Sequence, residues 1–304
     1  MWQIDSTYKA RDVEETIDLY FYRPLGYAVA HFCRNLRITP NVVTIISIVI
    51  GVAGGHLMFY RDIALNAWGF TLWVIADLLD SADGQLARMT NNKSKFGRIL
   101  DGVAGNIIFL SIYLHLLVRM VVSGGSPYLY FILVALGGIS HSIQSALADY
   151  YRNAYMKFVV DPTKSELDNS ENIRIEYRAT SFVRNPVRKI MLRFYLNYTV
   201  EQEAFSKNFQ ALRKRVEKQY GIAIPGWLSE ECRRLNKPLM KYYAILTTNT
   251  RMIIMALCVI LDQVPLYFLI EVLGINLVMV IVTWHQERLS ARLLGQIHER
   301  TVTA

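Results

Sequence analysis

The chain has 304 residues, of which 53% are hydrophobic and 19% are charged, and its mean hydropathy is +0.22. This composition is too apolar for an ordinary soluble domain and favours an integral membrane protein. The formal net charge is +8, and residues 151–241 account for all of it, with 18 Lys and Arg against 10 Asp and Glu. Because basic residues gather at the ends of apolar segments, we expect membrane lipids as their partner and no nucleic acid.

Residues 1–40 precede the first apolar segment and are predicted to be a cytoplasmic amphipathic segment. Residues 10–37 mix apolar and charged side chains at helical spacing. This pattern is typical of a helix that lies on a membrane surface, with a short soluble helix as the alternative. Pro24 is expected to break the helix, because proline lacks a backbone N–H. Residues 1–15 show no apolar core, so no cleavable signal peptide is expected.

Six segments are apolar over about 20 residues, the length that a transmembrane helix needs. They are Asn41–Tyr60, Ile63–Asp83, Ile99–Ser123, Pro127–Asp149, Tyr242–Leu261 and Val264–Trp284. We therefore predict an all-α integral membrane protein with six transmembrane helices. Residues 41–150 would contain the first four spans and the candidate functional site described below. Residues 151–241 would form a cytoplasmic helical insertion. Residues 242–304 would contain the last two spans and a cytoplasmic tail. The positive-inside rule places both termini in the cytoplasm, and we expect a bacterial inner membrane.

The most informative residues lie where the second predicted span ends. Asp80 and Asp83 are three residues apart, so they share one face of a helix, and Gly84 and Ala87 continue that face with little bulk. A carboxylate in a bilayer core costs roughly 2.5–3.5 kcal/mol on insertion scales. Such residues are therefore expected to bind a cation, to face water or to take part in chemistry.

A third carboxylate follows at the start of the next span. Asp101 lies four residues after Gly97, and a short hairpin between the two helices would bring it to Asp80 and Asp83. Oxygen ligands without His or Cys favour Mg²⁺, Mn²⁺ or Ca²⁺ over zinc. Arg88 would add positive charge beside a diphosphate. These residues predict a metal–phosphate site at the cytoplasmic face.

The spacing D-x2-D-G-x2-A-R-x8-G-x3-D over residues 80–101 resembles the signature of the CDP-alcohol phosphotransferases. These membrane enzymes make phospholipids by exchanging one alcohol for another on a CDP-activated phosphate. The segment I-T-P-N-V-V-T at residues 38–44 is similar to the beginning of the family's first helix. The resemblance covers residues 10–150, and the last two helices correspond by hydropathy only.

The resemblance implies a role for each matching position. Asp80, Asp83 and Asp101 would bind the metal, which would be two ions of Mg²⁺ or Mn²⁺. The implied substrate-binding positions, for the diphosphate and the cytidine, are Asn41, Thr44, Gly84, Ala87, Arg88 and Gly97. The expected partners are a CDP-activated alcohol and a lipid or polar alcohol acceptor. Because the family tends to dimerise, a homodimer is also expected.

The sequence departs from the family pattern at one position. The pattern ends with an aspartate four residues after Asp101, which is both a metal ligand and the proposed general base. This chain has Gly105 there, which has no side chain. The neighbouring Asn106 can ligate a metal but cannot take a proton.

Three interpretations stay open. Asp77, His141 or Asp149 could supply the base. The metal or the substrate phosphate could instead deprotonate the acceptor, with Asn106 as a ligand. In the third interpretation, the chain is inactive.

Each candidate residue also has a purely structural interpretation. Asp77 could line a wet cavity, His141 could be a packing residue, and Asp149 could be a charge at the end of a helix. Similarly, Arg251 could face the site and bind an anion or could snorkel to the interface.

The predicted function is a membrane phospholipid or sphingolipid head-group synthase that releases CMP. The long insertion contains N-Y-T and Q-E-A segments that weakly resemble bacterial enzymes placing head groups such as inositol phosphate on sphingolipids. This favours a ceramide or diacylglycerol as acceptor. The alternatives are an inactive CDP-lipid-binding homologue and an ion or solute transporter, since intramembrane carboxylates also mark ion paths.

Overall fold

The computed structural model describes residues 10, 12–92, 95–221 and 223–303. The described residues are helical nearly throughout and contain no strand. Six helical runs are long and apolar enough to cross a membrane, which confirms the predicted all-α fold. These runs are Pro40–Leu57, Ile63–Met89, Phe96–Val122, Pro127–Val160, Gly226–Ile260 and Val264–Arg300. Residues 1–9 and 11 of the predicted amphipathic segment lie outside the described residues.

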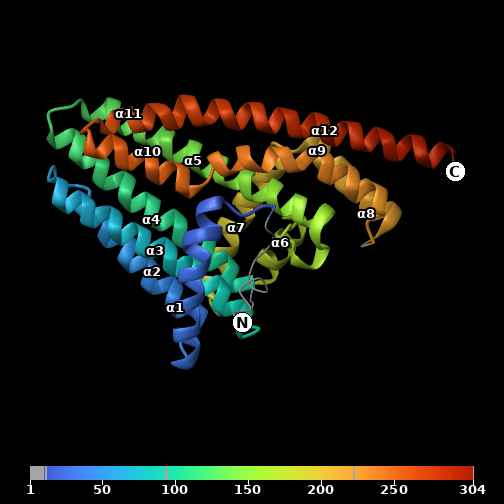
Figure 1. Ribbon diagram of the computed structural model, residues 1–304, viewed down its shortest axis with the longest axis horizontal. Coiled ribbons are helices and arrows are strands. Elements are labelled where there is room, and N and C mark those ends of the chain that lie inside the picture. Colours follow the sequence, from blue (N-terminus) through green and yellow to red (C-terminus); the bar gives the residue numbers. More distant parts are fainter. Residues whose placement is uncertain (1–9, 11, 93–94, 222, 304) are drawn as a thin grey trace.

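Helices α1 to α5 contain the first four spans. They are α1 (Arg23–Asn35), α2 (Pro40–Leu57), α3 (Ile63–Met89), α4 (Lys95–Val122) and α5 (Pro127–Tyr155). Helices α6 to α9 form most of the insertion, and they are α6 (Ser170–Ala179), α7 (Pro186–Ala204), α8 (Lys207–Tyr220) and α9 (Gly226–Ile245). The last helices are α10 (Thr248–Ile260), α11 (Val264–Leu269) and α12 (Asn276–Thr303). Figure 1 shows α12 running along one side of the bundle, with α8 and α9 beside its C-terminal half.

Glycines allow α2 to pack tightly between α3 and α4. A Cβ atom at Gly54 would lie 2.7 Å from the carbonyl oxygen of Gly69 in α3. A Cβ atom at Gly51 would lie 2.7 Å from the side chain of Ile108 in α4. Small residues bring transmembrane helices close together in this way. The packing holds the ends of α3 and α4, where the predicted motif lies, at a fixed separation.

The N-terminal helix is not broken at Pro24, contrary to the prediction. Pro24 lies in the first turn of α1, and the turn before it, Asp18–Tyr22, is a π-helix. A proline ring crowds the carbonyl group one turn earlier, and the wider π-turn accommodates this without ending the helix. Gln85 of α3 donates a hydrogen bond to the carbonyl oxygen of Arg23 at 3.1 Å. The start of α1 is therefore fixed against α3.

The insertion shares its hydrophobic core with the spans. The ring of Tyr151, near the end of α5, stacks on that of Tyr243 in α9 at a centroid distance of 5.4 Å. Phe209 of α8 packs at the edges of Tyr150 and Tyr151. Helix α7 packs against both α4 and α5. Because of these contacts, the insertion forms part of the same body as the transmembrane bundle.

A fully buried ion pair joins α10 to the last span. Arg251 Nε donates to Glu271 Oε1 at 3.1 Å, and neither side chain is exposed. The other guanidinium nitrogens donate to the carbonyl oxygen of Leu246 at 2.6 Å and to Gln144 Oε1 at 2.5 Å. Glu271 lies in the π-helical segment Ile270–Ile275. Arg251 therefore neither faces the site nor snorkels, because its charge is satisfied inside the bundle.

Candidate functional site

A cavity of about 520 Å³ opens between the transmembrane helices and the insertion. Its walls come from α3, α4, α5 and α7, from the segment before α1, and from the residues between α9 and α10. Among the described residues, ten acidic side chains line it, against four arginines. The cavity is therefore strongly negative and would attract a cation.

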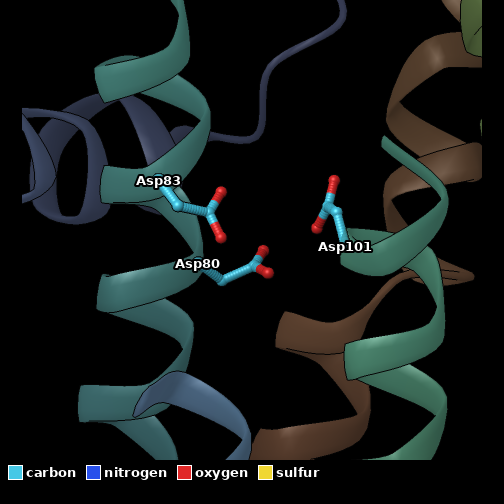
Figure 2. Close-up of side chains that lie close together, drawn as sticks. All are labelled: Asp80, Asp83 and Asp101. Atoms are coloured by element: carbon cyan, nitrogen blue, oxygen red, sulfur yellow. The ribbon is translucent and has the colours of Figure 1, made fainter. Parts of the chain in front are cut away.

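Three aspartates face one another in this cavity. Figure 2 shows Asp80 and Asp83 on α3 directed toward Asp101 on α4. One carboxylate oxygen from each residue lies within 4.8 Å of the other two. Asp83 is buried, whereas Asp101 is exposed to the cavity. Carboxylates at this separation repel one another, so a cation between them would stabilise the arrangement. The donor set fits a hard divalent ion such as Mg²⁺ or Mn²⁺, which the residues could bind without His or Cys.

Helix α2 contributes a residue that orients one of these carboxylates. Thr44 Oγ1 lies 2.5 Å from Asp83 Oδ2 and 3.1 Å from the carbonyl oxygen of Pro40. Thr44 is almost completely buried and does not line the cavity. Asn41, one turn earlier, does not line the cavity either. Thr44 is therefore placed to hold Asp83, and its predicted contact with a diphosphate would require a rearrangement.

The predicted phosphate-binding arginine lies over the motif glycine. The guanidinium nitrogens of Arg88 are 3.6 and 3.7 Å from the position of a Cβ atom at Gly84. Within the described part of the chain, Arg88 Nε and Nη2 are buried without a hydrogen-bond partner. Gly84 and Arg88 line the cavity, whereas Ala87 and Gly97 do not. The free donors of Arg88 would suit the oxygens of a phosphate group.

The other cavity arginines are already engaged. Arg23 binds Glu14 at 2.7 Å, and Arg98 lies 3.5 Å from Asp168. Arg152 donates to the carbonyl oxygen of Val13. Arg88 is thus the cavity arginine without an internal partner among the residues that the structure describes.

Gly105 also lines the cavity and leaves open space there. A Cβ atom at Gly105 would meet no atom within 4 Å among the described residues. The backbone at Gly105 therefore has room for the first atom of a side chain. The neighbouring Asn106 donates through Nδ2 to the carbonyl oxygen of Gly102 at 2.8 Å. Its side-chain oxygen stays available as a ligand on the cavity wall.

All three candidate bases line the cavity, but their surroundings differ. His141 is buried, and its ring packs 4.0 Å from that of Phe109 between centroids. Asp149 accepts hydrogen bonds from Asn153 at 2.9 Å and from Tyr198 at 3.3 Å. Asp77 lies one turn before Asp80, and its side chain has no hydrogen bond to any other described residue. Asp77 is the candidate with the least engaged side chain.

Sequence reasoning did not identify the cavity wall formed by α7. Tyr195 and Tyr198 line the cavity, and Tyr195 donates to Asp168 Oδ2 at 3.2 Å. Arg98 of α4 lies over the ring of Tyr195, 5.7 Å from its centroid. Two tyrosines three residues apart in a charged insertion give no signal in the sequence, because their partners Asp168, Asp149 and Arg98 lie in other segments of the chain.

A second acidic group was also missed. Glu15 accepts hydrogen bonds from Thr247 at 2.6 Å and from Asn249 at 2.9 Å. Asp18 accepts from Asn249 at 3.0 Å. Burial raises the pKa of both Glu15 and Asp18 above the ordinary carboxylate range. These contacts connect the segment before α1 to the beginning of α10 at the side of the cavity.

Comparison with known proteins agrees with this geometry. The sequence model of the CDP-alcohol phosphatidyltransferase family matches residues 37–164. A CDP-diacylglycerol–glycerol-3-phosphate 3-phosphatidyltransferase of Cereibacter sphaeroides is 34% identical over 92 residues, which are 30% of this chain and 40% of that protein. An uncharacterized protein of Aquifex aeolicus is 30% identical over 81 residues, which are 27% of this chain and 40% of that protein.

The matched segment spans 40% of the length of each of these relatives. Residues 37–164, which match the family model, include the helices that position the three aspartates, Gly84 and Arg88. Residues 37–164 therefore form a CDP-alcohol phosphatidyltransferase domain.

Proposed function

We propose that this protein transfers a phosphate-linked group from a CDP-alcohol to a second alcohol and releases CMP. The observation that supports this most directly is the meeting of Asp80, Asp83 and Asp101 within 4.8 Å. The cavity around them is large enough for a small substrate and also contains the unpaired donors of Arg88. The proposed cofactor is Mg²⁺ or Mn²⁺, held by the three aspartates.

The proposed reaction exchanges one bond to phosphorus for another. The acceptor oxygen forms a bond to the phosphorus that bears the first alcohol, and the bond from that phosphorus to the CMP oxygen breaks. When bound, the divalent metal would neutralise the diphosphate and stabilise the leaving phosphate. Arg88 would donate hydrogen bonds to the diphosphate oxygens, and Thr44 would keep Asp83 in its binding orientation.

The acceptor hydroxyl must lose a proton, and we assign this proton to Asp77. Asp77 and Asp80 are three residues apart on α3, so both carboxylates are on the same side of the helix. Asp149 is engaged by Tyr198 and Asn153, and His141 packs against aromatic rings. Asp77 would then replace the aspartate that the family has at the position of Gly105.

For the substrates, we propose that a head group such as phosphoinositol passes from its CDP derivative to a ceramide or diacylglycerol. The name of the Cereibacter sphaeroides relative specifies CDP-diacylglycerol and glycerol 3-phosphate as substrates. We propose different substrates here, because α7 forms a wall of the cavity and lies outside residues 37–164, which match the family. The alternative is a CDP-lipid-binding homologue without turnover, which Gly105 favours. A transporter is a weaker alternative, because the acids gather in one cavity.

The test is CMP release by the purified full-length protein in detergent with Mg²⁺ or Mn²⁺. One set of reactions would contain CDP-diacylglycerol with polar alcohols. The other would contain CDP-inositol, CDP-ethanolamine or CDP-choline with ceramide or diacylglycerol. We expect CMP release in the second set, and none by the Asp83→Asn variant. Release in the first set alone would contradict the assigned substrates but not the reaction.

Two further variants separate the active enzyme from a binding homologue. The Asp77→Asn variant should lose CMP release while retaining metal-dependent binding of CDP. The Gly105→Asp variant should fold normally, because a Cβ atom at this position meets no described atom within 4 Å. If only Gly105→Asp releases CMP, the natural chain is a binding protein and Asp77 is not its base.

A further inference from the structure

Helix α7 presents an apolar stripe away from the protein. Val187, Ile190 and Phe194 follow one another at intervals of three and four residues, so they lie on one face of the helix. They are 61%, 48% and 59% exposed, and Phe182 and Val183 extend the apolar surface before the helix begins. Water-exposed apolar surfaces of this kind are uncommon in monomeric proteins and mark a contact with something else.

The flanks of this stripe are strongly basic. Residues 174–193 contain six Lys and Arg and a single acidic residue, Glu176. Arg188 is the one member of this set with an ion pair among the described residues, to Glu176 at 3.0 Å. Arg184 and Arg193 are exposed beside the stripe. An apolar stripe with cationic flanks is the pattern of a helix that lies in the headgroup region of an anionic membrane.

The position of α7 in the fold agrees with this interpretation. Toward its C-terminal half, the helix lines the cavity through Tyr195, Tyr198 and Gln202. Its contacts with α4 and α5 are at the ends of these spans where Arg98 and Asp149 lie. The helix is therefore at the level where the spans leave the bilayer. Phe194 belongs to both surfaces, since it is exposed on the stripe and also lines the cavity.

We propose that α7 is a membrane-surface helix whose outer face binds the anionic lipid leaflet. A second copy of the chain is the less favourable occupant, because two surfaces with this excess of positive charge would repel each other. The proposal does not depend on the chemistry of the cavity. With α7 at the lipid surface, Phe194 would place one wall of the cavity at the depth of the headgroups and acyl chains.

The test measures the depth of α7 in the full-length protein in nanodiscs. In a background where Cys33, Cys232 and Cys258 are changed to alanine, Val187→Cys and Lys218→Cys are each labelled with the fluorophore NBD. Lys218 is an exposed residue of α8 and provides the control. We expect doxyl-labelled lipids to quench NBD at position 187 at least about threefold more than at position 218 when the discs contain phosphatidylglycerol.

The charge dependence provides a second measurement that does not alter the stripe. Arg184→Gln together with Arg193→Gln should reduce quenching at position 187 in discs with phosphatidylglycerol, and much less in phosphatidylcholine discs. Equal quenching at positions 187 and 218 would overturn the proposal. It would also be overturned if quenching at position 187 changed neither with phosphatidylglycerol nor with the two arginine substitutions. Crosslinking of two copies through position 187, with protection from doxyl lipids, would overturn it in favour of a dimer.

Discussion

Two groups of charged side chains lie within the helical bundle, and their charges are satisfied in opposite ways. Arg251 and Glu271 bind each other at 3.1 Å with no exposure, and Gln144 and a backbone carbonyl take the remaining donors of the arginine. Asp80, Asp83 and Asp101 instead meet as three like charges beside a cavity. The first group has opposite charges that neutralise each other within the chain, whereas we propose that a cation from outside neutralises the second.

This difference separates a structural group from a functional one. In a buried ion pair each charge compensates the other, and removing one partner leaves an uncompensated charge. Carboxylates that repel one another lower stability until a ligand binds, and this is typical of a site. The arginine in the core would therefore affect folding, and the aspartates in the cavity would affect binding and turnover.

The largest expected effect is on activity at the aspartate cluster. Asp83→Asn should reduce CMP release by about a thousandfold or more, which corresponds to ~4 kcal/mol at 1.4 kcal/mol per tenfold. In EDTA, its thermal unfolding midpoint should equal or exceed that of the natural chain, because one of three repelling charges is gone. A lower midpoint in EDTA would show that Asp83 is a structural residue.

The next effect is on stability at the buried pair. Arg251→Met should lower the free energy of unfolding in detergent by about 3–5 kcal/mol, because Glu271 would remain as an unpaired buried charge. The double variant Arg251→Met, Glu271→Met should recover most of this loss. Chemical unfolding followed by tryptophan fluorescence would measure both. If the double variant is as unstable as the single one, packing around Arg251 matters more than charge.

A smaller effect is expected for the residue that orients Asp83. Thr44→Val keeps the volume of the side chain but removes the hydroxyl at 2.5 Å from Asp83. Loss of such an orienting contact typically costs 10- to 100-fold in metal affinity or activity. Metal titrations of CMP release should show an increased metal requirement, and Thr44→Ser should retain most activity. A Thr44→Val enzyme with unchanged metal dependence would contradict this role.

The smallest expected effect is on how stability depends on pH, through Glu15 near the beginning of α10. Burial raises the pKa of Glu15 in the folded chain, so the folded state binds protons more readily than the unfolded state. Stability should then fall as the pH rises from the ordinary carboxylate range through the raised pKa, and it should increase on acidification over that window. Glu15→Gln should flatten this part of the pH profile of the unfolding midpoint. An unchanged profile would show that Glu15 does not titrate there.

The spans and the motif could be predicted because both are local patterns. Each predicted span is a continuous apolar run, and the structure contains six helical runs that are long and apolar enough to cross a membrane. Two of them, Gly226–Ile260 and Val264–Arg300, extend beyond the predicted Tyr242–Leu261 and Val264–Trp284. The spacing between Asp80 and Asp101 also depends only on chain order, and the family match includes it. Pro24 was the exception, since a local rule predicted a break where the chain forms a π-turn.

The tertiary structure decided the partner of each polar side chain. The sequence could not show that Arg251 would meet Glu271, that Thr44 would hold Asp83, or that α7 would close the cavity with Tyr195 and Tyr198. Arg251 and Glu271 are 20 residues apart along the chain, and Thr44 and Asp83 are 39 residues apart. Hydropathy and spacing describe a residue and its neighbours on one helix, whereas these roles depend on which helices pack together and at what depth.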